Sequence, residues 1–391
     1  MKKKLIILTI VYFIFGISIN LIHPITTNYV RSLNLNDVYF GIFFSLMSLG
    51  IFLGALFWGK LSDKVGRTKI LCLGILGYAV FQFCFGFFNE IPVLILLFRV
   101  LSGVFVSAPH TLFLSFVRDI EKEENLGKSY SFMSSFHLLG AALGYKIGGY
   151  LYSEANLSFN NVFLVQVLSL VALAIVFYLC FNKENDNKIE IKNKYSSLLN
   201  LKNQNKSIII FFISLLFITL SQTIITKYID VFVIDLKYDT NNLGDMVLLT
   251  GIIGIISNLI FTKVLNKYKN LNYNLLYIIA IFISVISLFV TFTFNQDNFV
   301  IMMYTTYSIF IVCKSIMLPL EQSIIARNTS GNSGEVMGLR QSFVALGQVI
   351  GPLIASNMYP LNHYSVFYFS IIIYGIIGII LLINYKVKKG V

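Results

Sequence analysis

The sequence predicts an all-α membrane protein, with twelve transmembrane helices in two pseudo-symmetric six-helix bundles. Its 391 residues are 57% hydrophobic and only 12% charged, whereas soluble proteins average about 45–50% apolar and about 25% charged residues. The apolar residues form runs of about 20, which is the length that crosses a bilayer core. Lys and Arg gather in every second connection between these runs. The composition therefore excludes a water-soluble enzyme and a disordered chain.

The predicted spans form two sets of six, separated by the longest polar stretch of the chain. This stretch, residues 183–206, predicts a cytoplasmic linker between an N-terminal bundle (1–182) and a C-terminal bundle (207–391). The N-terminus is basic and then apolar, but its apolar run is too long for a signal peptide, so we expect it to remain as the first span. The spans are expected near 5–28, 38–58, 70–88, 92–115, 130–152, 161–181, 207–231, 243–262, 274–294, 299–325, 336–358 and 364–384.

The distribution of basic residues predicts the orientation of the chain. With the N-terminus inside, the inner connections hold 24 of the 30 Lys and Arg residues, and the outer connections hold only Arg31 and Lys237. By the positive-inside rule, both termini are cytoplasmic in a cell membrane. Topology and attraction to lipid headgroups account for the net charge of +12, so no nucleic-acid partner is expected. The abundance of Asn, Lys and Ile suits a bacterial, AT-rich genome.

Motifs of enzymes and metal sites do not occur in the sequence. No Walker A, HExxH or GxSxG pattern appears, so neither an ATP-driven pump nor a hydrolase is indicated. The four cysteines, Cys72, Cys84, Cys180 and Cys313, fall in predicted spans without a CxxC pair. We therefore expect no enzyme activity, cofactor, metal site or disulfide.

Two pairs of segments repeat between the halves. GKLSDKVGRTKIL at 59–71 takes the same place as TKVLNKYKNLNYN at 262–274, and SAPHTLFLSFVRD at 107–119 matches IMLPLEQSIIARN at 316–328. Internal duplication of this kind is typical of repeat-built transporters.

The connection between the second and third predicted spans carries the motif Gly59-Lys60-Leu61-Ser62-Asp63-Lys64-Val65-Gly66-Arg67. It resembles the G-x-L-a-D-r-x-G-r motif of the major facilitator superfamily, and the spans and half-repeat resemble its twelve-span drug:proton antiporter branch. The resemblance implies a small-molecule substrate, coupling to protons and a monomer. It also implies a conformational latch formed by Gly59, Asp63, Gly66 and Arg67. A basic turn between two helices is the simpler alternative, but it does not explain an Asp between two Gly at this spacing.

Two further segments resemble the same family in part. Leu97-Phe98-Arg99 lies in the fourth span, where the family's buried Arg is associated with proton coupling; the alternative for Arg99 is a side chain that snorkels to the outer surface. The fifth span resembles the antiporter motif G-x-x-x-G-P-x-x-G-G, which implies export, but Tyr145 replaces the Pro. Its glycines also suit close helix packing; they are Gly140, Gly144, Gly148 and Gly149.

Ionisable residues within spans indicate the substrate path, because they are costly in a bilayer unless they face a cavity or a partner. Glu321 is a candidate proton carrier, or else a structural partner of a basic residue. Lys227 has a simpler role as the i,i+3 partner of Asp230, and Lys146 has one as a snorkelling side chain. The predicted substrate-cavity residues are Asn20, His23, Lys146, Gln222, Lys314, Gln341 and Gln348.

Three functions remain open from the sequence. The first is a proton-coupled exporter of small molecules that works by alternating access. The second is a carrier that moves an anionic or zwitterionic metabolite or a lipid-linked substrate by symport or exchange, which the surplus of cations favours. The third is a transport-dead sensor or scaffold, against which Asp63, Arg67 and Arg99 argue.

Overall fold

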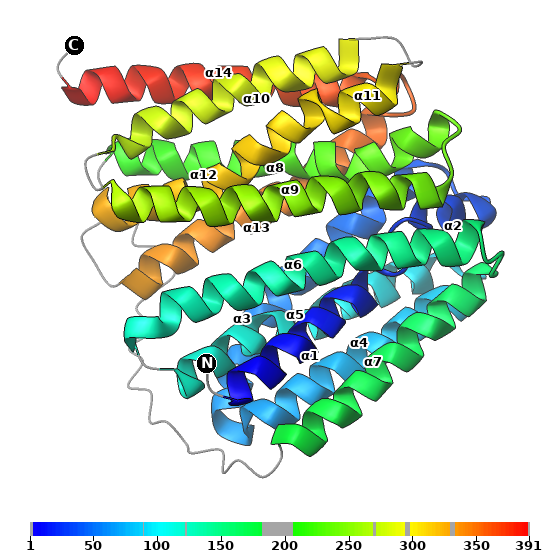
Figure 1. Ribbon diagram of the computed structural model, residues 1–391. Coiled ribbons are helices and arrows are strands. Elements are labelled where there is room, and N and C mark those ends of the chain that lie inside the picture. The colour runs from blue at the N-terminus through cyan, green and yellow to red at the C-terminus, as the bar shows by residue number, and fades with distance from the viewer. Residues whose placement is uncertain are drawn as a thin grey trace. The chain divides into compact units, whose positions relative to one another are not determined.

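The computed structural model describes residues 3–88, 90–121, 123–181, 206–268, 271–293, 298–328 and 333–389. Within these ranges the chain is α-helical and contains no strand, as the composition predicts (Figure 1). The helices of the first half are α1 (Lys3–Asn20), α2 (Thr26–Ser32), α3 (Val38–Val65), α4 (Arg67–Phe87), α5 (Pro92–Ile120), α6 (Glu123–Ser153) and α7 (Phe159–Phe181). Those of the second half are α8 (Lys206–Asp235), α9 (Thr240–Lys267), α10 (Tyr273–Thr293), α11 (Phe299–Tyr304), α12 (Thr306–Asn328), α13 (Ser333–Met358) and α14 (Ser365–Lys389).

Ten helices of the described ranges are long and apolar enough to cross a membrane. The two other predicted spans, 130–152 and 336–358, fall on α6 and α13, which are 31 and 26 residues long. Both are long enough to span a bilayer, but their mean hydropathy is diluted by Ser, Gln, Asn and charged residues.

The first predicted span is not one continuous helix. α1 ends at Asn20, and residues 21–25 form turns before α2 begins at Thr26. Pro24 lies in this break, and it has no N–H to continue a helical hydrogen-bond ladder. The tenth predicted span is also interrupted, because Thr305 leaves the helical conformation (ψ −83°) between α11 and α12. The predicted span 5–28 thus contains α1 and the start of α2, and the predicted span 299–325 contains α11 and most of α12.

The chain forms two compact units. The first contains Met1–Lys192 and Val233–Gly251, and the second contains Asn193–Phe232 and Ile252–Val391. Of the predicted linker, 183–206, only Lys206 lies within the described residues. The predicted domain boundaries stay predictions.

The core of the first unit consists of aromatic and aliphatic side chains. α4 packs against α5 and α7, and α1 packs against α6. Phe15, Ile75, Phe113 and Phe177 are fully buried between these helices. Gln166 of α7 donates from Nε2 to the carbonyl oxygen of Ser18 at 3.0 Å, so the NH2 group of this buried amide is paired.

The second unit is built around α10, which packs against α12 and α14. The rings of Phe292 and Phe367 stack with their centroids 3.9 Å apart and 9° between their planes. The outward faces of these helices remain apolar, as Ile286 and Ile372 are 65% and 60% exposed. Such faces suit lipid as the surrounding solvent.

Candidate functional site

The turn between α3 and α4 places the motif residues Asp63 and Arg67. Gly66 ends α3 and precedes α4 with φ 110° and ψ 137°, a left-handed backbone conformation that glycine adopts without steric cost. The turn makes Arg67 the first residue of α4, where its Nη2 lies 3.8 Å from Asp63 Oδ1. The Nε of Arg67 lies 3.1 Å from Asp119 Oδ2, at the end of α5. One guanidinium thus joins the ends of three helices.

Asp119 is a member of this cluster that sequence reasoning missed. The half-repeat at 107–119 could have indicated it, because this segment ends in FVRD, with Asp119 as its last residue. Arg67 is 15% exposed, and the carboxylates of Asp63 and Asp119 are 31% and 28% exposed. Partial burial strengthens the attraction relative to a fully solvated pair. Gly59, in contrast, has no described atom within 4 Å of the place where a Cβ would stand, so packing against the described residues does not explain this glycine.

Arg99 is buried in the first unit and does not reach the surface. It is 1% exposed, and its Nε lies 3.5 Å from the carbonyl oxygen of Phe43. Its Cζ lies 4.7 Å from the ring centroid of Phe85 and 5.9 Å from that of Phe44. No carboxylate of the described ranges forms an ion pair with it. Aromatic faces attract cations, and they supply the contacts that hold this charge.

The glycines of α6 lie against other backbones. A Cβ added to Gly140 or Gly144 would overlap the carbonyl oxygens of Phe13 and Ile17 in α1, and one added to Gly148 would overlap that of Leu21, in the turn after α1. The four-residue spacing puts these three glycines on one face of α6. A Cβ on Gly149 would overlap the carbonyl oxygen of Thr240, at the start of α9. These contacts require residues without side chains.

The predicted cavity residue Lys146 is held in an ion pair. Its Nζ lies 2.7 Å from Asp245 Oδ1 and donates to Asn241 Oδ1 at 2.6 Å. Asp245 and Asn241 both belong to α9. Together with the close approach of Gly149 to Thr240, these bonds fasten the start of α9 to α6.

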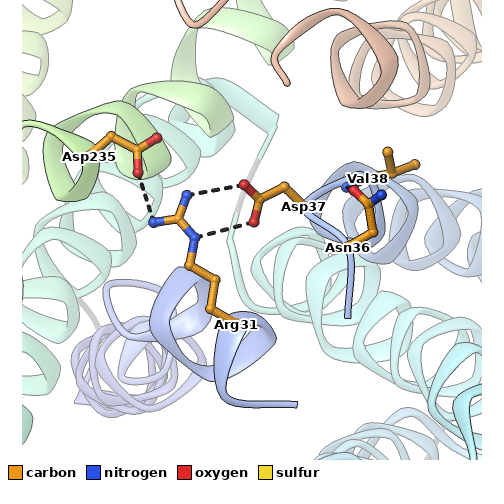
Figure 2. A network of polar contacts seen from close by, with 5 residues as sticks. All are labelled: Arg31, Asn36, Asp37, Val38 and Asp235. Carbon is orange, nitrogen blue, oxygen red and sulfur yellow. Dashed lines mark hydrogen bonds and ion pairs between the residues drawn. The ribbon is translucent and has the colours of Figure 1, made fainter. Parts of the chain in front are cut away.

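A second network fastens the end of α8 to α2 (Figure 2). Arg31 Nη1 lies 2.7 Å from Asp235 Oδ1. On its other side, the Nε and Nη2 of Arg31 donate to the two carboxylate oxygens of Asp37, at 3.2 and 3.3 Å. Burial lowers the pKa of the Arg31 guanidinium, but the hydrogen bonds and charges of Asp235 and Asp37 outweigh it and raise the pKa above its ordinary value. Arg31 is therefore a permanent cation between two anions.

The other predicted cavity residues of the first unit have short-range partners. Asn20 donates from Nδ2 to the carbonyl oxygen of Gly16 in its own helix, at 2.9 Å. The imidazole of His23 lies in the break after α1 and stacks on Phe44 and Tyr145, with centroids 5.9 and 5.6 Å apart. Both side chains are thereby oriented by neighbouring groups.

In the second unit, Lys314 lies eight residues after the start of α12 and is partly buried. No carboxylate of the described residues lies within ion-pair distance of its Nζ, and the charge of Lys227 of α8 acts on it. Glu321, two turns further along α12, is 8% exposed. It accepts from the Nε of Arg340 of α13 at 2.7 Å, and from Nη2 of the same residue.

The three predicted glutamines lie on helices of the second unit. Gln222 in α8 and Gln348 in α13 are half-buried. Gln341 is exposed and accepts from Arg340 Nη1 at 3.4 Å. Within the described ranges, no cluster of His, Cys, Asp and Glu side chains has the arrangement of a metal site.

Comparison with protein families gives one result across the chain. The model of the Major Facilitator Superfamily matches residues 8–313 and 274–390. Two bacterial relatives are similar over 94% or more of their length. The multidrug resistance protein 1 of Bacillus subtilis is 24% identical over 397 residues, which cover 99% of this chain and 98% of that protein. The quinolone resistance protein NorA of Staphylococcus aureus is 24% identical over 379 residues, covering 95% and 94% of the two chains.

Solved structures show the same fold at lower identity. A D-xylose-proton symporter matches with a TM-score of 0.74 and 14% identity, covering 98% of this chain and 96% of the other. The nucleoside transporter NupG matches with a TM-score of 0.78 and 14% identity, covering 97% and 99%.

Proposed function

Because the chain belongs to the major facilitator superfamily, and is thus a multi-pass membrane transporter and not an enzyme, we propose that it exports small molecules by proton-coupled alternating access. The observation that carries this proposal is its similarity to two drug-resistance proteins over 95% or more of the chain. We place it as a monomer in a bacterial plasma membrane with both termini cytoplasmic, as the basic connections predict.

Two groups of ion pairs supply the conformational elements that alternating access needs. Asp63, Arg67 and Asp119 form the latch at the Lys-rich end of the spans. The pairs Arg31–Asp235 and Lys146–Asp245 form a lock at the opposite end. An alternating-access cycle requires each set to form in one state and open in another. Lys146 is therefore assigned to this lock and not to substrate binding.

The proton-coupling role is assigned to Glu321, with Arg99 as the buried cation of the first unit. In the present structure Arg340 supplies the counter-charge of the Glu321 carboxylate. When that pair opens, the nearly buried carboxylate needs another partner, and a proton fills this role. Exchange between Arg340 and a proton on Glu321 links proton binding to a change in contact between α12 and α13.

The substrate side chains are assigned to Lys314, Gln222 and Gln348. Amides bind a ligand by hydrogen bonds without requiring a charge. Lys314 supports the second candidate, a carrier of anionic substrates, because no ion pair to a described carboxylate neutralises it and because Lys227 adds to the local positive charge.

Inside-out vesicles with an imposed pH gradient distinguish these two functions. The assay compares uptake of a cationic drug, a quinolone and an anionic dicarboxylate by the wild type and by Lys314→Ala. Gradient-driven uptake of the drugs that survives Lys314→Ala supports export of drugs. Uptake of the dicarboxylate alone, lost with Lys314→Ala, would instead establish the anion carrier.

A further inference from the structure

A cavity of about 90 Å³ opens within the second unit, at one end of its helices. Its wall includes the first turns of α8 and α10 and the last turns of α12 and α14. It does not include any residue assigned above to the latch, the lock, proton coupling or substrate binding. Its lining residues are Ser207, Ile208, Phe211, Asn274, Tyr277, Ile278, Ile324, Leu381, Asn384 and Tyr385.

Half of this wall is polar and rich in hydrogen-bond donors. Asn384 of α14 donates from Nδ2 to Ser207 Oγ at 3.0 Å, and Asn272 Nδ2 donates to the hydroxyl of Tyr385. Tyr277 is 1% exposed, and its hydroxyl has no hydrogen-bond partner among the described residues. Buried polar groups are rarely left unpaired unless a ligand or water completes them. The wall therefore fits a ligand that accepts hydrogen bonds.

The electrostatic surroundings favour an anion. Lys206 directly precedes Ser207, Lys386 directly follows Tyr385, and both lysines are exposed. The N-termini of α8 and α10 add partial positive charge at the same end. Segments 201–229, 262–293 and 365–391 contain no Asp or Glu. On α12, Glu321 lies three residues before Ile324, but Arg340 neutralises it.

The surface that continues from this cavity is apolar. From Leu275, next to Asn274, α10 exposes Ile279 and Ile283, which are 44% and 41% exposed. From Ile383, next to Asn384, α14 exposes Ile379, which is 53% exposed. A soluble anion makes no use of such a surface, whereas the acyl chains of a phospholipid pack against it.

From this juxtaposition we infer that the cavity binds the phosphate group of an anionic phospholipid, with the lipid's acyl chains along α10 and α14. Ser207, Asn274 and Asn384 supply hydrogen bonds, and Lys206 and Lys386 supply charge. Basic pockets between membrane helices bind such headgroups by these contacts. The end concerned carries the Lys-rich connections, which the predicted orientation assigns to the cytoplasmic side. The site is independent of the transport proposed above.

Native mass spectrometry of the full-length protein in detergent tests this inference. The probes are phosphatidylglycerol, phosphatidylcholine and soluble glycerol phosphate, measured on the wild type and on Lys206→Gln/Lys386→Gln. Loss of two surface lysines is expected to weaken phosphatidylglycerol binding roughly thirtyfold, whereas Lys263→Gln, an exposed lysine of α9, leaves it unchanged. Phosphatidylcholine is expected to bind much more weakly than phosphatidylglycerol.

A second variant, Asn384→Asp, keeps the shape of the wall and places a negative charge in it, so it is expected to abolish phosphatidylglycerol binding. Equal binding of phosphatidylglycerol and phosphatidylcholine, or unchanged binding in both variants, would overturn the inference. Displacement of the lipid by an equal concentration of glycerol phosphate would show a site for a soluble phosphate and overturn the lipid assignment. Because binding is measured without transport, its failure would leave the proposed function untouched.

Discussion

Arg67 and Asp119 form a side-chain ion pair of 3.1 Å, between the first residue of α4 and the last turn of α5. The two residues are 52 positions apart in the sequence, and the left-handed turn at Gly66 lets Arg67 bond Asp63 and Asp119 together. The motif of the α3–α4 turn is thus one part of a three-residue cluster.

The first prediction concerns Asp119. Asp119→Asn leaves Arg67 with Asp63 as its carboxylate partner, at 3.8 Å. We expect this variant to slow transport about tenfold. A tenfold change in rate corresponds to about 1.4 kcal/mol in the stability of the latched state. The measurement is the initial rate in proteoliposomes. Glu121→Gln changes a neighbouring acid outside this cluster and serves as the control. A normal rate in Asp119→Asn would remove Asp119 from the latch.

The second prediction concerns the backbone of Gly66. Gly66→Ala forces a side chain into a φ of 110°, and we expect a loss of roughly 1–2 kcal/mol of stability. The matched control is Gly375→Ala in α14, where no described atom lies within 4 Å of the added methyl group and where alanine favours the helix. Thermal unfolding in detergent gives the comparison. Equal melting temperatures for the two variants would show that the turn is not strained.

The third prediction concerns the outer lock. Thr240 is 1% exposed, so a cysteine at this position is shielded from a maleimide while the lock is closed. In an otherwise cysteine-free chain, the rate of its labelling therefore reports opening of the lock. Arg31→Gln removes the partly exposed ion pairs with Asp235 and Asp37, and Lys146→Gln removes the one with Asp245. Each variant is expected to raise the labelling rate by up to about fivefold. Lys237→Gln, an exposed lysine at the same end, should leave the rate unchanged. Unchanged labelling in both lock variants would contradict the lock.

The fourth prediction separates the structural role of Glu321 from its coupling role. Arg340→Leu leaves a nearly buried carboxylate without its partner and should cost about 3–5 kcal/mol of stability, whereas Glu321→Gln/Arg340→Leu should recover much of it. Thermal unfolding measures this difference. Transport assays on the recovered double variant then isolate coupling, which we expect to be lost. Gradient-driven transport by the double variant would exclude Glu321 as the proton carrier.

The sequence predicts the helices better than the contacts between them. Long apolar runs and basic connections are local signals, and they locate the spans because a bilayer imposes one length on all of them. The breaks at Pro24 and Thr305 are harder to predict, because a single residue inside an apolar run gives little sign of whether the helix continues through it.

Pairing of charged residues could not be predicted for a different reason. Lys146 and Asp245 are 99 positions apart, and nothing in either segment indicates its partner. Lys146 therefore resembled a cavity residue by sequence, although its Nζ lies 2.7 Å from a carboxylate oxygen. For Arg99, in contrast, the sequence did indicate the environment of the side chain. Its position in the fourth span suggested burial, and the structure holds it among aromatic rings.

The most direct test of proton-coupled export is the pH inside proteoliposomes loaded with a pH-sensitive dye. A quinolone gradient is imposed without any initial pH gradient. Our account predicts that quinolone movement drives a measurable proton flux in the opposite direction in the wild type, and that Glu321→Gln abolishes this flux. Quinolone movement without a change in internal pH would contradict proton coupling, and an unchanged flux in Glu321→Gln would contradict the role of this residue.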